Sequence, residues 1–237
     1  RIKYELMSHP RVSIIIPNRD HVEDLRRCIG SILERTTYDN YEIVVVENNS
    51  VSVDIEEYYR ELKQYSNVKV VRYVGEFNYS RVNNYGVECA DGQFIILLNN
   101  DTEVITVNWI EEMLMYCQRK DVGAVGVKLL YPDKTIQHAG VVIGLGAHRT
   151  AGHTHYGKSY ENLGYMGRLC YAQDVSAVTG ACLMVKKHTF VEMGGLDDHF
   201  AVSLNDVDFC LRLRKMGLLN VFTPFAELYH YESASRG

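Results

Sequence analysis

Short β-rich runs alternate with segments whose apolar residues recur at helical spacing in the first half of the chain. The runs RVSIIIP, YEIVVVENNS, VKVVRYV and FIILLNNDTEV are expected to be strands. Helical stripes separate them over residues 22–33, 55–62 and 80–89, and a fourth stripe follows over 107–117. Such alternation is typical of a mostly parallel sheet with helices on its faces, so it predicts a doubly wound, Rossmann-like α/β unit.

The pattern is looser after about residue 122. Strand-like runs (VGAVGVKLL, TIQHAGVVIG, VSAVTGACLMV) flank a glycine- and histidine-rich segment over 144–167, which is expected to be a loop excursion. A helix over 206–216 and a final pair of strands, LLNVF and AELYHY, are predicted to follow. No repeat or linker divides the 237 residues, so one domain over 1–237 is predicted, with two small domains as the alternative. Because the chain begins without methionine, we expect it to be excised from a longer protein.

Net charge and cysteine content indicate which partners and which compartment to expect. A formal net charge of -5 gives no general basic field, which argues against nucleic acid or an anionic membrane as the main partner. The six cysteines form no CxxC pair and lie mostly in apolar patterns, as reduced cysteines do. No apolar run approaches the roughly 18 to 20 residues that span a bilayer. A cytoplasmic chain is therefore expected, and peripheral association of the full protein with the inner face of the membrane is compatible with it.

Polar residues follow three of the predicted strands, at 18–20, 47–50 and 99–101. Ligands of open α/β sheets bind beyond the carboxyl ends of the strands, so these residues predict one cleft. The first of these ends, PNRDHV, contains no glycine, and GLGAHR at 144–149 lacks the third glycine of a dinucleotide fingerprint. A dinucleotide-dependent dehydrogenase is therefore excluded. A nucleotidyltransferase would need a glycine- and lysine- or arginine-rich loop after the first strand, and this loop is absent.

An ordered set of motifs resembles the family 2 glycosyltransferases of the GT-A fold, especially the bacterial, rhamnosyltransferase-like members that build surface polysaccharides. The motifs are VSIIIPNRD, YEIVVVENNS, ADGQFIILLNNDTEV, VTGACLMVKK, GGLDDHF, NDVDFCLRLRKMG and LYHYES. The resemblance implies a mixed sheet flanked by helices, with a nucleotide-binding half over about 10–103 and an acceptor half over about 104–237. It also implies inverting, metal-dependent transfer of a hexosyl or rhamnosyl group from a UDP- or dTDP-sugar to a glycan or glycolipid hydroxyl.

The resemblance implies a metal site at the end of the fourth strand. There Asn99, Asn100 and Asp101 take the place of a DxD-like motif, in which Asp101 binds Mn²⁺ or Mg²⁺ and the ion holds the donor diphosphate. His230 of LYHYES takes the place of a second metal ligand. Hard cations prefer oxygen ligands, and imidazole suits Mn²⁺ better than Mg²⁺. Asn99 leaves one negative charge fewer than the usual motif, so weak metal affinity without nucleotide is expected. The alternative is a turn with Asx hydrogen bonds.

The donor contacts that the resemblance implies come from three further segments. Glu47 takes the position that reads the nucleobase, where its carboxylate would accept from N3-H of uracil or thymine; the alternative is a solvated turn residue. Asp20 could equally cap the first helix, as could Asn18, and Ser80 is expected to cap the third. The other implied donor contacts, from the ends of the first strand and from FNYSRVNN, are Pro17, Asn18, Asp20, Asn78, Arg81 and Asn84.

The catalytic residue that the resemblance implies is Asp206 in NDVDFCLRLRKMG, as the general base that deprotonates the acceptor hydroxyl. The alternative is that Asn205, Asp206 and Asp208 are only a cap and first-turn acids of the following helix. Asn205 stands where the family usually has glutamate. Together with Asn99 it supports the competing hypothesis of a non-catalytic nucleotide-sugar or glycan-binding module. His148, His153 and His155 lack the partners of a zinc site, so an acceptor-side loop is expected there.

Overall fold

The computed structural model describes residues 1–145 and 150–232, so His148 lies outside the described residues. The first half contains the predicted alternation of strands and helices. Its elements are β1 (Val12–Asn18), α1 (Val22–Arg35), β2 (Tyr41–Glu47), α2 (Val53–Leu62), β3 (Val68–Arg72), α3 (Tyr79–Glu88) and β4 (Phe94–Leu98).

The second half combines two long strands, β6 and β12, with several strands of only three residues. The elements are β5 (Thr102–Val104), α4 (Trp109–Cys117), β6 (Val122–Leu130), β7 (Ile136–His138), β8 (Val141–Ile143), β9 (Ala151–His153), a kinked 3₁₀ segment (Tyr165–Cys170), β10 (Gln173–Val175), β11 (Cys182–Lys186), α5 (Lys187–Glu192), α6 (Asn205–Lys215) and β12 (Leu219–His230).

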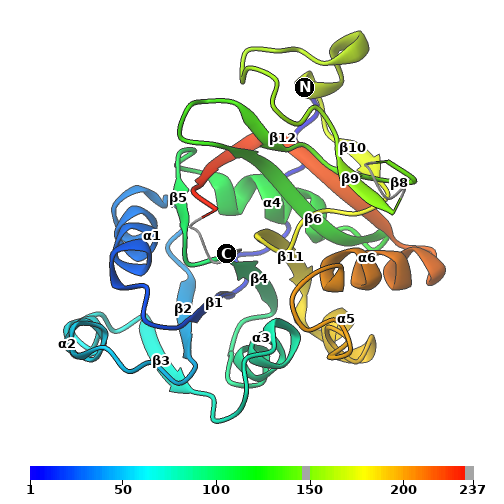
Figure 1. Cartoon of the computed structure of the whole chain (residues 1–237). Helices are drawn as coiled ribbons and strands as arrows, with labels where there is room; N and C mark the ends of the chain where they lie inside the picture. The colour runs from blue at the N-terminus through cyan, green and yellow to red at the C-terminus, as the bar shows by residue number, and fades with distance from the viewer. Residues whose placement is uncertain (146–149, 233–237) are drawn as a thin grey trace.

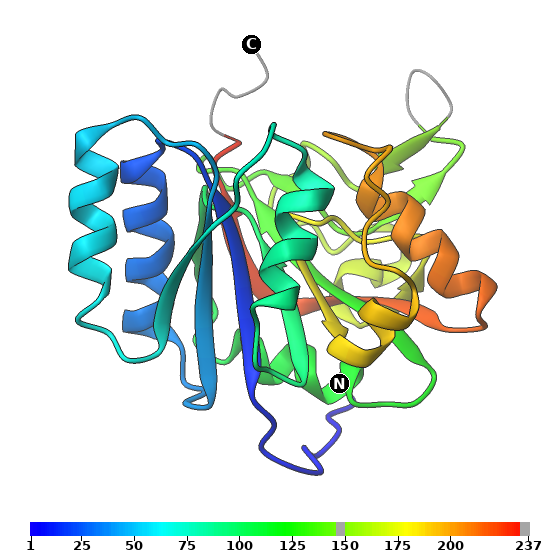
Figure 2. The same cartoon turned by 90° about the horizontal axis from the view of Figure 1, so that it is seen from below.

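One mixed sheet runs through the whole molecule, in the order β10-β12-β6-β11-β4-β1-β2-β3, with β5 on β12 and β7 on β6 (Figure 1). Strands β3, β2, β1 and β4 are parallel, whereas β11 is antiparallel to both β4 and β6. The sheet has helices on both faces (Figure 2). Apolar residues of α1, α2 and α4 pack in the cluster that contains Ile14 and Ile16, and those of α3, α5 and α6 pack in the cluster that contains Ile15.

Two predicted helix caps are wrong. Asp20 has a left-handed backbone (φ 57°) and does not cap α1, because its Oδ1 accepts from the backbone N–H groups of Val51 and Ser52. Asn18 does not cap it either, since no side chain caps α1. Asn78, not Ser80, caps α3, with its Oδ1 accepting from the N–H of Arg81.

Other predictions for individual segments also need correction. The two expected final strands form one strand, β12, whose register against β6 shifts between Thr223 and Glu227. The 144–167 segment is not only loop, because β9 within it pairs with β8.

All six cysteines are free, and four of them are buried in the core. Burial raises the pKa of the Cys28, Cys117 and Cys210 thiols to about 12, so they remain protonated apolar side chains at neutral pH. Within the described ranges, no helix has the length and apolar character needed to cross a bilayer.

The packing of α3 on the sheet can be tested at Gly86. A Cβ atom there would lie 2.4 Å from Cγ2 of Ile15 and 2.7 Å from Cγ2 of Val46, whereas a Cβ at Gly30 of α1 would meet nothing within 4 Å. We expect Gly86→Ala to lower the free energy of unfolding by about 1–3 kcal/mol through overpacking. Gly30→Ala should raise it by about 0.5–1 kcal/mol. Urea unfolding measures both, and a Gly86→Ala variant as stable as the parent would contradict this packing.

Candidate active site

The carboxyl ends of β1 and β4 meet near the middle of the sheet, as the sequence predicts. The strands pair in parallel, and Asn100 donates from Nδ2 to Oδ1 of Asn18 over 2.6 Å. Asn18 donates from its own Nδ2 to the hydroxyl of Tyr59 over 2.9 Å. The polar residues that follow these two strands therefore form one hydrogen-bonded group.

This group lines a cavity of about 330 Å³, which we name the strand-end cavity. Arg19 and His21 supply its basic side chains, and Asp24 and Asp101 its acidic ones. The size suits a small polar ligand, and the mixture of amides and basic groups offers donors to an anion. The remaining lining residues are Pro17, Asn18, Asn48, Phe77, Tyr79, Val82, Asn99 and Asn100.

Asp101 and His230, the predicted metal ligands, lie side by side, and Asp101 lines the strand-end cavity. Asp101 follows β4 and His230 ends β12, and Oδ1 of Asp101 is 3.1 Å from Nε2 of His230. Each side chain is 11% exposed. Adjacent ligands of an octahedral ion with bonds of about 2.1 Å lie about 3 Å apart, so this pair fits one divalent cation. A proton between the two atoms would satisfy the same geometry as an ion pair.

Tyr79 and Asn99 form a wall beside this pair. Asn99 has its Nδ2 3.2 Å from Nε2 of His230, and its Oδ1 accepts from the Tyr79 hydroxyl over 3.1 Å. The Tyr79 hydroxyl is also 3.1 Å from the carbonyl oxygen of Gly180. Burial, and then the charge of Asp206, raise the pKa of Tyr79, so its hydroxyl stays protonated.

Beyond this wall lies a second cavity of about 370 Å³, which we name the α6 cavity. Tyr79 and Asn99 line both cavities, so the two adjoin at these residues. His230 and Asp206 also line the α6 cavity. The predicted metal ligand and the predicted base therefore face one space.

Two backbone amides hold the carboxylate of Asp206. Its Oδ2 accepts from the N–H of Gly180 over 2.8 Å, and its Oδ1 accepts from the N–H of Val207 over 2.8 Å. Each carboxylate oxygen keeps a further lone pair, so the group can still accept a proton. Leu204, in a left-handed conformation, holds the N-cap position of α6, and Asp206 lies within the first turn.

The far side of the α6 cavity is lined by residues from the predicted acceptor-side loop. His153 of β9 lines it, and its Nδ1 is 3.1 Å from Nδ1 of the fully buried His138. Burial lowers the pKa of both imidazoles, so this pair is uncharged at neutral pH. Tyr131 and Tyr156, whose rings meet edge to face, add an aromatic side.

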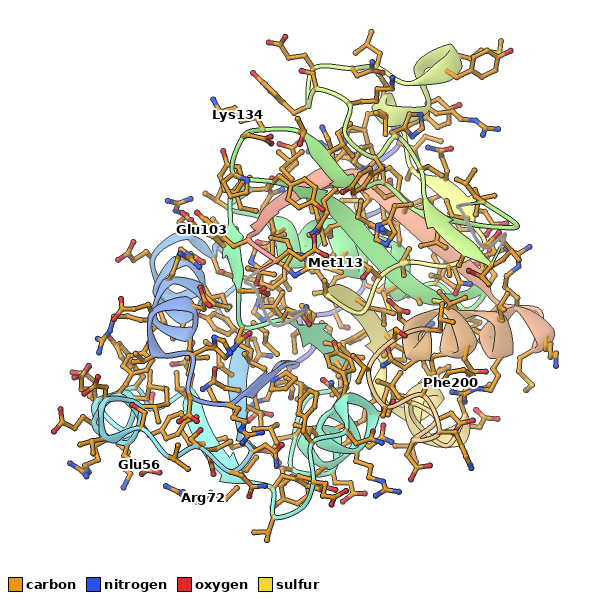
Figure 3. All side chains as sticks on the ribbon, viewed as in Figure 1. Glu56, Arg72, Glu103, Met113, Lys134 and Phe200 are labelled. Carbon is orange, nitrogen blue, oxygen red and sulfur yellow. The ribbon has the colours of Figure 1, made fainter. Side chains whose placement is uncertain are left out.

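Glu47 is buried beside the strand-end cavity and does not line it. Its Oε1 accepts from the N–H of Ser50 over 2.6 Å, and its Oε2 is 3.3 Å from Nη1 of Arg72. Arg72 also pairs with Glu56 at the edge of the molecule (Figure 3). These contacts correct the alternative of a solvated turn residue, because they bury Glu47 and hold the turn after β2. Its contact with a nucleobase stays a prediction.

Asn78, Arg81 and Asn84 connect α3 to residues 196–200. Asn78 donates to the carbonyl of Asp198, and Arg81 pairs with the Asp198 carboxylate. Asn84 exchanges two hydrogen bonds with the backbone of Leu196. Arg81 and Asn84 line another cavity, of about 610 Å³, and none of the three lines the strand-end cavity. Their contact with a donor also stays a prediction.

Sequence reasoning missed two residues of this region, Tyr79 and Gln137. Tyr79 begins α3, and the aromatic residue beside a capping asparagine was its only local signal. Gln137 lies in an apolar run that reads as an ordinary strand. His153 was expected in an acceptor-side loop, and it lines the α6 cavity together with Asp206.

Comparison with known proteins identifies the family. Residues 13–190 match the model of Glycosyl transferase family 2. An uncharacterised protein of Sinorhizobium fredii is 48% identical over the whole chain, which covers 26% of that relative. An O-antigen biosynthesis protein of Myxococcus xanthus is 37% identical over the whole chain, which covers 18% of it. The chain thus spans about a quarter or less of these relatives.

Two solved structures share the fold. GalNAc-T7 with UDP, GalNAc and Mn²⁺ superimposes with a TM-score of 0.76 at 17% identity, over 94% of this chain and 44% of that one. The mannosyltransferase PcManGT of Pyrobaculum calidifontis with GDP-Man and Mn²⁺ gives 0.73 at 14% identity, over 100% and 61%. The mixed sheet between two layers of helices is that of the GT-A fold. The chain belongs to glycosyltransferase family 2.

Proposed function

We propose that this chain transfers a hexosyl or rhamnosyl group from a nucleoside diphosphate sugar to a hydroxyl of a glycan or glycolipid, with inversion, in bacterial surface-polysaccharide synthesis. One observation carries the proposal: the cavity that holds Asp101 adjoins the cavity that holds Asp206, with Tyr79 and Asn99 common to both. A donor and an acceptor bound in the two cavities would therefore meet at this wall. The O-antigen relative supports the polysaccharide context.

The side chains at the wall fit a divalent cation. Asp101 offers a carboxylate oxygen and His230 an imidazole nitrogen, 3.1 Å apart, which suits Mn²⁺ and also admits Mg²⁺. When bound, the ion would neutralise the donor diphosphate and stabilise the charge of the leaving group. Arg19 and His21 would assist as donors to the phosphates. The fold neighbours bind Mn²⁺ with a UDP or a GDP-sugar, which supports the same kind of site here.

The transfer step is a direct displacement. The acceptor oxygen forms a bond to the anomeric carbon while the bond from that carbon to the diphosphate oxygen breaks, and the electron pair leaves with the diphosphate. The acceptor proton passes to Asp206, whose carboxylate the Gly180 and Val207 amides hold in place. One base with no second carboxylate assigned as a nucleophile favours inversion over a covalent intermediate.

The proposal also specifies the cellular compartment and the nucleobase of the sugar donor. We place the reaction in the cytoplasm, at the inner face of the membrane when the acceptor is a glycolipid. Free cysteines, four of them in the core, support a reducing compartment. UDP- or dTDP-sugars are the proposed donors, with Glu47 near the nucleobase end of the strand-end cavity.

Cooperative binding of metal and nucleotide tests the proposal. We expect Mn²⁺ and UDP together to raise the melting temperature more than the sum of their separate shifts, because Asp101 alone supplies too little charge and the diphosphate completes the coordination shell. Differential scanning fluorimetry with UDP, dTDP and GDP, each with and without Mn²⁺, measures this. Additive shifts for every nucleotide would count against a shared site.

A non-catalytic nucleotide-sugar or glycan-binding module is the second candidate, and one observation favours it. Asn205, where the family usually has glutamate, is buried; its Nδ2 donates to the carbonyl of Phe200 and its Oδ1 accepts from the N–H of Asp206. This residue therefore has a structural role and offers no acid to an acceptor. Such a module would show the cooperative shift and no transfer to any acceptor.

A further inference from the structure

Gln137 of β7 contacts the imidazole of His230 on the side away from Asp101. Its Oε1 lies 2.7 Å from Nδ1 of His230. Gln137 and His230 are both buried residues, so water cannot readily replace this bond. A buried amide at this distance determines which ring nitrogen carries hydrogen.

The orientation of the Gln137 amide follows from its other neighbour. Its Nε2 donates to Oε2 of Glu232 over 3.3 Å, and the same oxygen accepts from the hydroxyl of Tyr131 over 2.7 Å. The Oε2 atom of Glu232 is the acceptor in both hydrogen bonds, so the NH₂ group of Gln137 faces Glu232. The carbonyl oxygen then faces His230, whose Nδ1 must be the donor.

Hydrogen on Nδ1 directs the other ring nitrogen toward the predicted metal position. Nε2 of His230 lies 3.1 Å from Oδ1 of Asp101 and 3.2 Å from Nδ2 of Asn99. A neutral ring with hydrogen on Nδ1 presents a lone pair from Nε2, which is the form that binds a metal. We infer that Gln137 is a positioning residue that keeps His230 in its metal-binding tautomer, with Glu232 setting the orientation of Gln137. This inference rests on the proposed function.

Without Gln137 only the competing tautomer, which carries hydrogen on Nε2, keeps a hydrogen-bond acceptor for its N–H group. Hydrogen on Nε2 would be donated to the Asp101 carboxylate, so a proton would occupy the place that the cation needs. Partners of metal-binding histidines typically contribute about 10- to 100-fold to metal affinity by holding the tautomer and the ring orientation. Loss of Gln137 is therefore expected to weaken metal binding, even though Gln137 itself does not coordinate the ion.

The first variant is Gln137→Leu, which keeps a similar volume and removes the acceptor. We expect its affinity for Mn²⁺ in the presence of UDP to fall about 10- to 100-fold, measured by titration of free Mn²⁺ with electron paramagnetic resonance. Gln64→Leu, the same change at an exposed position, should bind Mn²⁺ as the parent does. Melting temperatures without ligand show whether each variant is folded.

An exchange of the two side chains separates the tautomer from simple loss of packing. In Gln137→Glu combined with Glu232→Gln, a carboxylate accepts from Nδ1 of His230, and the new amide at 232 donates to that carboxylate. Its carbonyl oxygen can still accept from Tyr131, and the total charge is unchanged. We expect this double variant to recover most of the Mn²⁺ affinity that Gln137→Leu loses.

The tautomer can also be observed without metal or turnover. Long-range ¹H–¹⁵N spectra at pH 8.5, with His230→Gln for assignment, should show hydrogen on Nδ1 of His230 in the parent. The spectra of Gln137→Leu should show it on Nε2 alone. Unchanged tautomer and Mn²⁺ affinity in Gln137→Leu would overturn the inference and leave the proposed function standing. A parent that binds no Mn²⁺ with any of UDP, dTDP or GDP would overturn both.

Discussion

Replacing Asp206 with asparagine is expected to lower the rate of sugar transfer by roughly 10²- to 10⁴-fold, the usual contribution of a positioned proton acceptor. The substitution keeps the size of the side chain and its place in the α6 cavity, but an amide cannot take the acceptor proton. Donor affinity should change little, because Asp206 does not line the strand-end cavity. Transfer rates with a working donor and acceptor measure the effect.

The Asp206→Asn substitution should also lower the stability of the fold, and this effect has to be separated from its effect on the transfer step. Asp206 accepts from two backbone amides, and an asparagine oxygen can serve only one of them. Leaving one amide unpaired costs about 1–3 kcal/mol, which should appear as a lower melting temperature. Asp208→Asn is the matched control on the same helix, because Asp208 pairs with Arg212 and lies outside the cavity. An Asp206→Asn enzyme that transfers at close to the parent rate would exclude Asp206 as the base.

Asp101→Ala is expected to abolish the joint stabilisation by Mn²⁺ and nucleoside diphosphate. At ligand concentrations about 100-fold above Kd this stabilisation is about 2.7 kcal/mol, or roughly 5–10 °C for a chain of this size. The stabilisation should be lost because Asp101 is the only carboxylate in the proposed pair of metal ligands. The readout is the ligand-induced shift of each variant from its own melting temperature, since Asp101 also contacts His230 in the protein without ligands, at 3.1 Å.

Asp91→Ala serves as the control for loss of a carboxylate. Asp91 pairs with Lys69 on the surface, and its side chain is 64% exposed. This variant should keep the whole ligand-induced shift. If Asp101→Ala also kept it, residues 99–101 would be a hydrogen-bonded turn and the metal assignment would be lost.

The parallel half of the sheet was predictable because its signals are local and strong. Ile14, Ile15 and Ile16 form an uninterrupted apolar run, and they are fully buried because helices cover both faces of β1. In α2, Ile55 and Tyr58 follow the helical period and are buried. Strands such as β5, β7 and β10 have three residues each, which is too short for any periodicity to distinguish them from loop.

The predictions of the helix caps were wrong for a different reason. Asn78 and Ser80 are both good capping residues, and local sequence does not choose between them. Tertiary contacts make the choice: Asn78 also donates to the carbonyl of Asp198, and Ser80 donates to that of Phe200. Those partners are more than a hundred residues away in the sequence.

The candidate site was only partly accessible from the sequence. The position of Asp101 follows from a buried strand that ends in polar residues, which is a physical argument. His230 had no local feature that separated it from the other histidines, and only the resemblance indicated it. Gln137 had no signal at all, because its role depends on an amide orientation that Glu232 imposes from a distant part of the chain.

The placement of β12 bears on the order in which the protein can mature during synthesis. This strand comes last among the described elements, yet it lies between β6 and β10 within the sheet, and β5 also pairs with it. A nascent polypeptide that has emerged from the ribosome only through β11 contains Asp101 and lacks His230. It also leaves β10 without its neighbour in the sheet. If Asp101 and His230 are the metal ligands, as proposed, metal with nucleotide would stabilise the protein only after β12 has joined the sheet, and would not guide the early assembly of the sheet.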